Sequence, residues 1–219
     1  MVASSEFSTM KKIKAAGGFA GSGFDVDPRK MGAIDALGFG ANNKLQLQIA
    51  DRFWCQPGPW GNTTGESYAD TGYQEAWPVT LGQPGTTGIL NDYTGGDVAR
   101  RLNPATPFSD SADRSKAVAD YVRKAAKTFL GQIEPVYPGM TAKYTGKAQL
   151  SVWHLNPNAL GAYSYWTPGY CDQFCTVERI PARPIHFAGE HCSQDFQGYI
   201  QGGADEGIRA ATEIITDFK

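Results

Sequence analysis

The sequence lacks the hallmarks of several protein classes. It has no apolar run of about 18 residues, the length that crosses a bilayer, so we expect no membrane span. Only 19% of the residues are charged, the net charge is −2, and no lysine and arginine cluster stands out, so nucleic acid is not an expected partner. With 26 glycines, 13 prolines and 41% hydrophobic residues, the 219-residue chain is typical of a loop-rich globular protein with a sizeable core.

Cysteine and histidine are also scarce, with four and three residues. Cys171 and Cys175, with His191 and Cys192 further along, lack the paired spacing of structural zinc sites, so free or buried thiols are favoured over a metal site. Residues 1–18 contain no apolar segment of the kind found in signal peptides, so we do not expect this stretch to be a signal peptide. A soluble protein is expected, but its compartment stays undecided.

A complete dinucleotide-binding loop is missing as well. Gly18, Gly21 and Gly23 lie close together, but Val26 stands where the pattern G-x-G-x-x-G requires its third glycine. No strand pattern precedes these glycines either. We therefore interpret this segment as a loop.

The most informative stretch is residues 185–215. Ile185–Ala188 is a short apolar run that predicts a buried strand, and Glu190 follows Gly189 where the chain would leave the sheet. A carboxylate at a strand end can bind ribityl or ribose hydroxyls, and a helix start at Gly198 can approach a ring that becomes anionic on reduction. After Gly198, apolar residues recur at helical spacing: Ile200, Ala204, Ile208, Ala211 and Ile215.

The order Phe187-Ala188-Gly189-Glu190, then Gly198-Tyr199, then a helix rich in small residues closely resembles the C-terminal flavin motif of the flavin-dependent amine oxidases. This family includes the monoamine, polyamine and L-amino-acid oxidases. The resemblance extends upstream through nearly the whole chain. It implies FAD as cofactor, bound by residues that include Gly189, Glu190, Gly198, Tyr199 and Ile200. For the glycines alone, an ordinary βα unit with close packing is the alternative.

Trp153 and the segment Gly161–Trp166 resemble the family's crossing from substrate domain to flavin domain. The match implies that Trp153 packs near the dimethylbenzene end of the ring, and that Tyr163 and Tyr199 form an aromatic cage in front of flavin N5, where the amine is oriented. Core packing is the alternative for these aromatics. Covalent monoamine oxidases carry a cysteine at the position of Ala162, so a non-covalent FAD is expected.

Lys44 begins a stretch, ending at Ile49, in which polar and apolar residues alternate as in a half-buried strand. The family resemblance implies that Lys44 holds a water against flavin N5. The alternative is a solvated lysine at a strand start.

Other patterns predict a framework around these residues. Further strands are expected at 88–93 and 148–153, a short helix within 28–38, loops and short strands over 55–81, and a sheet-covering helix over 112–133 that Asp110 or Ser111 would cap.

The expected fold class is α/β with α+β character, as the C-terminal part of an FAD-linked amine oxidase. Residues 1–34 would end an excursion from the FAD domain, 35–152 would form most of a mixed-sheet substrate domain, and 153–219 would supply the closing βα unit of the FAD domain. The implied reaction is oxidative deamination of a primary amine or amino acid by O2, which gives an imine, then an aldehyde or keto acid, with NH3 and H2O2.

The implied partners are a small amine, O2 and a missing N-terminal dinucleotide-binding half, while a homodimer and the identity of the amine are left open. Two alternatives remain. The chain could be a non-catalytic remnant or subunit of such an oxidase, which the absent dinucleotide fold supports. It could also be an aromatic-lined binding module without flavin.

Overall fold

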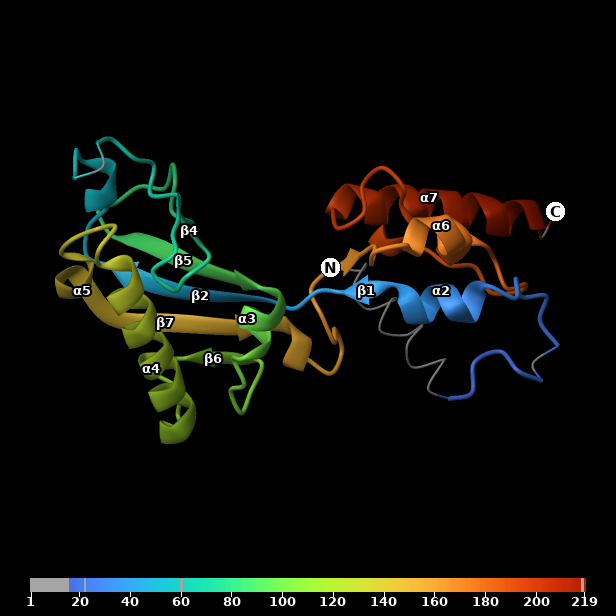
Figure 1. Cartoon of the computed structure of the whole chain (residues 1–219), viewed down its shortest axis with the longest axis horizontal. Helices are drawn as coiled ribbons and strands as arrows, with labels where there is room; N and C mark the ends of the chain where they lie inside the picture. The colour runs from blue at the N-terminus through green and yellow to red at the C-terminus, as the bar shows by residue number, and fades with distance from the viewer. Residues whose placement is uncertain (1–15, 22, 60, 218) are drawn as a thin grey trace. The chain divides into compact units, whose positions relative to one another are not determined.

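The computed structural model describes residues 16–21, 23–59, 61–217 and 219 (Figure 1). It divides into two compact units. The first contains Met1–Gly40 and Pro157–Lys219, and the second contains Ala41–Asn156. We predicted a flavin domain formed by residues 1–34 and 153–219 and a substrate domain formed by residues 35–152, and these assignments stay predictions. The segment expected to lack a signal peptide falls largely within residues 1–15, outside the described part.

A six-stranded sheet forms the second unit, and each of its neighbouring pairs is antiparallel. The strands predicted at 44–49, 88–93 and 148–153 are confirmed, as are short strands within 55–81. In spatial order the strands are β3 (Ser67–Tyr68), β4 (Glu75–Pro78), β5 (Gly88–Gly95), β2 (Asn42–Ile49), β7 (Tyr144–Val152) and β6 (Phe108–Asp110).

Helix α4 (Lys116–Ile133) covers one face of this sheet, as predicted (Figure 1). The helix begins at Lys116 instead of the predicted residue 112. The side chains of Asp110 and Asp113 accept hydrogen bonds from the N–H groups of Ala112 and Ser115, at 2.7 and 2.8 Å, and such local turns compete with helix formation. Two short helices, α3 (Gly96–Arg100) and α5 (Met140–Lys143), and the 3-10 turns η1 (Phe53–Cys55) and η2 (Trp153–Leu155) complete this unit.

The core of the second unit lies between α4 and the sheet. Strand alternation turns Leu45, Leu47 and Ile49 into it and leaves Lys44 exposed on the opposite face. From α4 the buried side chains are Val118, Ala119, Val122, Ala126, Phe129, Leu130 and Ile133.

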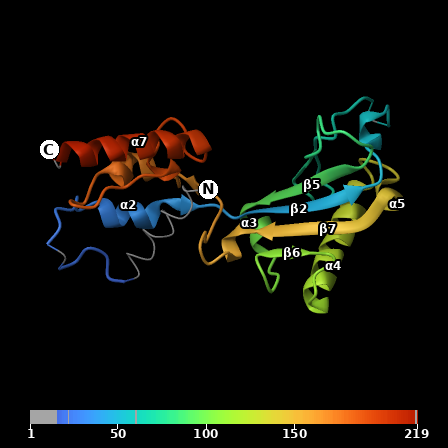
Figure 2. The same ribbon diagram turned by 180° about the vertical axis from the view of Figure 1, so that it is seen from behind.

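The first unit combines the long helix α7 with several short elements (Figure 2). Its core is small. The predicted short helix is α2 (Lys30–Ala36), and strand β1 (Gly38–Phe39) pairs with β8 (Ser164–Tyr165). Lys30 is buried, and its ammonium donates to the carbonyls of Val177, Glu178 and Ile180 at 2.7–3.1 Å. The remaining elements are α6 (Tyr170–Phe174), η3 (Val177–Arg179), η4 (Glu190–Cys192) and α7 (Ile200–Asp217).

The strand predicted at Ile185–Ala188 is wrong. Ile185 makes an isolated bridge with Ala182, and residues 186–188 pair with no strand among the described residues. An apolar run becomes a strand only beside a hydrogen-bonding neighbour, which sequence pattern cannot supply. The run still packs against the core through Phe187.

The helix predicted after Gly198 is confirmed as α7, but its apolar stripe faces outward. Ile200, Ile208 and Ile215 are 86%, 70% and 59% exposed. The buried face instead carries Glu206, whose carboxylate pairs with Arg209 at 2.6 Å and with Arg179 at 3.2 Å. Among the described residues, none of the helices has the length and apolar composition needed to span a membrane.

Candidate functional site

Glu190 is the centre of the candidate site in the first unit. The residue is only 3% exposed, and its carboxylate accepts three hydrogen bonds. Oε1 accepts from the Ser164 N–H at 2.8 Å, while Oε2 accepts from the Ser164 hydroxyl at 2.9 Å and the Gly198 N–H at 2.6 Å. One buried charge therefore joins strand β8 to the turn before α7, although these lie far apart in sequence.

This junction brings the two predicted cage tyrosines together. Tyr163 precedes Ser164, and Tyr199 follows Gly198, so each tyrosine is next to a residue that Glu190 holds. A Cβ built on Gly198 would lie 3.8 Å from the ring of Tyr163. Both tyrosines are exposed, at 38% and 70%, so neither ring fills the core.

The two motif glycines have backbone conformations that side chains disfavour. Gly189 has φ +124° and ψ 165°, a region essentially reserved for glycine, and this conformation starts the turn η4 that positions Glu190. Gly198 has φ +83°. The Gly198 N–H already donates to Glu190. The N–H groups without a partner inside α7 are therefore those of the first residues of the helix.

Ala162 and Ile200 border the same junction along the chain. The Ala162 N–H donates to the carbonyl of Gly40 at 2.8 Å, which anchors the chain just before Tyr163. Ile200 is the first residue of α7 and is largely exposed. Of the predicted site residues, the structure thus brings together Ala162, Tyr163, Gly189, Glu190, Gly198, Tyr199 and Ile200.

The other two predicted residues belong to the second unit. Lys44 is exposed on β2 opposite Tyr93 and Ser151, and its ammonium lies 6.0 Å from the centroid of the Tyr93 ring. Trp153 follows β7 and meets Phe108 edge-to-face, with the ring centroids 5.1 Å apart. Their roles toward a flavin stay predictions.

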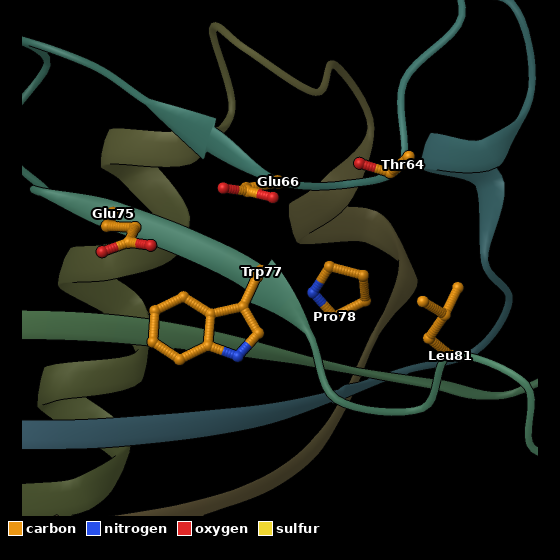
Figure 3. Close-up of a pocket in the computed structure, with 6 residues that line it drawn as sticks. All are labelled: Thr64, Glu66, Glu75, Trp77, Pro78 and Leu81. Atoms are coloured by element: carbon orange, nitrogen blue, oxygen red, sulfur yellow. The ribbon is translucent and has the colours of Figure 1, made fainter. Parts of the chain in front are cut away.

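A hollow of about 300 Å³ lies at the β3–β4 edge of the sheet, with Thr64 and Glu66 on one side and the β4 residues Glu75 and Trp77 on the other (Figure 3). The Tyr68 hydroxyl lies 2.9 Å from Glu66 and 3.0 Å from Glu75. These hydrogen bonds to carboxylates raise the pKa of Tyr68 to about 12, because ionising the phenol would add a third negative charge. We assign this solvent-open hollow no ligand.

Two residues at or near the Glu190 junction, Ser164 and Gly202, were not predicted from the sequence. Ser164 is buried between the exposed Tyr163 and Tyr165, a period-two alternation that could have marked it. Gly202, in the first turn of α7, lies so close to the preceding turn that an added Cβ would meet the Phe196 carbonyl oxygen at 2.3 Å. A glycine inside a helical pattern is the signal for such close packing. Among the described residues, no group of three or more acidic, histidine or cysteine side chains could hold a metal ion.

Comparison with known proteins shows which family the chain resembles. A family model described as flavin containing amine oxidoreductase matches residues 7–215. An L-amino acid oxidase of Bothrops pictus is 25% identical over 189 residues, covering 86% of this chain and 35% of that protein. A flavin-containing amine oxidase of Danio rerio is 24% identical over 194 residues, covering 87% of this chain and 34% of that protein. The chain thus spans about a third of the length of these curated relatives.

Solved structures share the fold. A cyclohexylamine oxidase from Brevibacterium oxydans superposes with a TM-score of 0.67 at 21% identity, covering 88% of this chain and 39% of that one. A putrescine oxidase solved with putrescine bound gives a TM-score of 0.63 at 19% identity, covering 86% and 38%. The predicted fold class, part of the fold of an FAD-linked amine oxidase, is confirmed by these neighbours.

Proposed function

Because the chain belongs to the family of flavin-containing amine oxidoreductases, we propose that it is the C-terminal part of an FAD-dependent oxidase of primary amines or amino acids. The observation that carries the proposal is the junction at Glu190, which holds Tyr163 and Tyr199 as exposed neighbours at the start of α7. Two aromatic walls suit an amine that must arrive with the carbon beside its nitrogen aimed at an acceptor.

The residues of the junction fit an FAD. Three of the roughly four acceptor positions of the Glu190 carboxylate are used, which leaves one on Oε1 for a cofactor hydroxyl. The 18-residue helix α7 begins two residues after Gly198, and the N-terminus of a helix favours negative charge of the kind that develops on a reduced ring.

When bound, FAD would accept a hydride from the carbon beside the amine and would then be reoxidised by O2, which is reduced to H2O2. Water then hydrolyses the imine to an aldehyde or keto acid and ammonia. The part of Tyr163 and Tyr199 is to orient the neutral amine and exclude water beside it. The part proposed for Lys44 is to hold a water at flavin N5.

We also propose that a further polypeptide segment, containing a dinucleotide-binding fold, completes the protein. The outward apolar stripe of α7 supports this, because exposed apolar patches usually mark an interaction surface. The absence of a G-x-G-x-x-G loop supports it too, since the pyrophosphate of FAD needs such a glycine-rich turn.

Anaerobic addition of substrate tests the proposed function. We expect the complete protein to be yellow, and an amine or amino acid from a panel to bleach the flavin absorbance, with colour and H2O2 returning when O2 is admitted. A colourless protein would favour a binding module without flavin. A yellow protein that no amine bleaches would favour a non-catalytic subunit.

A second experiment tests the mode of flavin attachment. Because Ala162 carries no thiol, we expect acid denaturation of the complete protein to release all of its flavin through a filter that retains the polypeptide. Yellow colour kept with the denatured protein would contradict non-covalent binding. The cysteines Cys55, Cys171, Cys175 and Cys192 would then be examined by peptide mapping.

A further inference from the structure

A cavity of about 350 Å³ lies in the second unit, between strand β5 and helix α4. This volume is at the lower end of the range for small-molecule sites, about 300–1,000 Å³. Its walls include the apolar side chains of Leu45, Leu102 and Phe129 and the rings of Tyr73 and Tyr121. It lies on the α4 face of the sheet, the opposite face from Lys44.

Two polar side chains of β5 line this apolar cavity. Asp92 and Thr94 are 8% and 7% exposed, and as residues two apart on a strand they project to the same face. The Asp92 Oδ1 atom and the Thr94 hydroxyl are both buried, and neither has a hydrogen-bond partner among the described residues. Burying a carboxylate oxygen without a hydrogen-bond partner is costly, so the position of Asp92 Oδ1 on a cavity wall requires an explanation.

The neighbouring tyrosines do not provide that partner. The Tyr73 hydroxyl donates to Ser67 at 2.9 Å, and the Tyr121 hydroxyl accepts from the Asn103 N–H at 2.8 Å. Both tyrosines line the cavity, and an aromatic ring attracts a cation placed over its face. A metal ion requires several acidic or imidazole ligands, whereas Asp92 is the one carboxylate among the residues that line the cavity, so an organic cation fits it better than a metal.

We propose that this cavity binds a small primary ammonium ligand with a compact apolar body. Asp92 and Thr94 accept hydrogen bonds from the ammonium, and the body packs against Leu45, Leu102 and Phe129. The proposal rests on the cavity alone and does not require the proposed oxidase activity.

The binding should depend on pH. Burial without a compensating charge raises the pKa of Asp92 to about 7. The other titratable or charged groups that line the cavity are Tyr73, Arg101, Tyr121 and Lys124. Burial alone accounts for the raised pKa of Asp92, so the two cations, Arg101 and Lys124, do not compensate its charge. A proton and an ammonium compete for the Asp92 carboxylate. The affinity for the ammonium should therefore increase about tenfold for each unit by which the pH is raised toward 7, and should be constant at higher pH.

Hexylamine is the probe, added to the isotopically labelled whole chain without flavin and followed by NMR at pH 8. We expect saturable shifts of cavity resonances with a Kd of about 1 mM or tighter. Hexan-1-ol should bind at least about tenfold more weakly, because it lacks the charge. An absence of saturable shifts in cavity residues would overturn the proposal.

Three variants locate the site. Asp92→Asn keeps the shape and removes a buried charge, so it should fold, and it should weaken hexylamine binding about tenfold or more and abolish the pH dependence. Asp70→Asn, at an exposed aspartate of the same unit, should bind like the wild type. Tyr163→Leu should also leave binding unchanged. Loss of binding in Tyr163→Leu but not in Asp92→Asn would place the amine at the tyrosine pair and refute the cavity site.

Discussion

Replacing Glu190 with glutamine is expected to lower the free energy of unfolding of the first unit by about 2–4 kcal/mol. Both carboxylate oxygens face backbone N–H groups, of Ser164 and of Gly198. A glutamine places an NH2 group where one oxygen was, so one buried N–H then meets another donor. The loss combines a charge-assisted hydrogen bond with a buried donor left unsatisfied.

The same variant should impair the proposed amine oxidation, because the two tyrosines adjoin the residues that Glu190 holds. Amide hydrogen exchange is the local readout, and the Ser164 and Gly198 amides should exchange faster in Glu190→Gln while those of the α4 core do not. The matched control is Glu66→Gln, at an exposed glutamate of the other unit, which should change stability by no more than about 0.5 kcal/mol. Unchanged exchange at Ser164 and Gly198 would show that Glu190 does not hold the junction.

Replacing Lys44 with methionine is expected to slow reoxidation of the reduced flavin by O2 about a hundredfold in the complete protein. A fixed positive charge that orients a water beside developing negative charge is worth a few kcal/mol, and methionine keeps much of the length of the side chain without the charge. Lys44 is exposed on β2, so the replacement should leave the folding of the sheet intact.

Stopped-flow mixing of the reduced protein with O2 measures this rate directly, and the anaerobic reduction by amine serves as the internal reference. Lys127→Met is the matched control, since Lys127 is an exposed lysine on α4 that covers the other face of the sheet. Its reoxidation rate should equal that of the wild type. Reoxidation of Lys44→Met at the wild-type rate would show that Lys44 is an ordinary solvated lysine without a role at the flavin.

Local pattern alone determined much of this protein. The alternation from Lys44 to Ile49 predicted β2 and its buried face, and the spacing of three and four after Gly198 predicted α7. The order of Gly189, Glu190 and Gly198 predicted a flavin site through its resemblance to a family motif; the structure builds turns at these residues, and the site stays a prediction. These features depend on a few consecutive residues, whose side-chain directions follow from the backbone repeat.

Tertiary structure decided the features that need partners distant in sequence. Residues 186–188 are not a strand because a strand needs a hydrogen-bonded neighbour. On α7 the buried face carries Glu206, which pairs with Arg209 and with the distant Arg179, while the apolar stripe faces outward. The cavity at Asp92 exists only because α4 packs over β5. In each case the free energy depends on which group meets another in space, and periodicity along the chain does not encode that pairing.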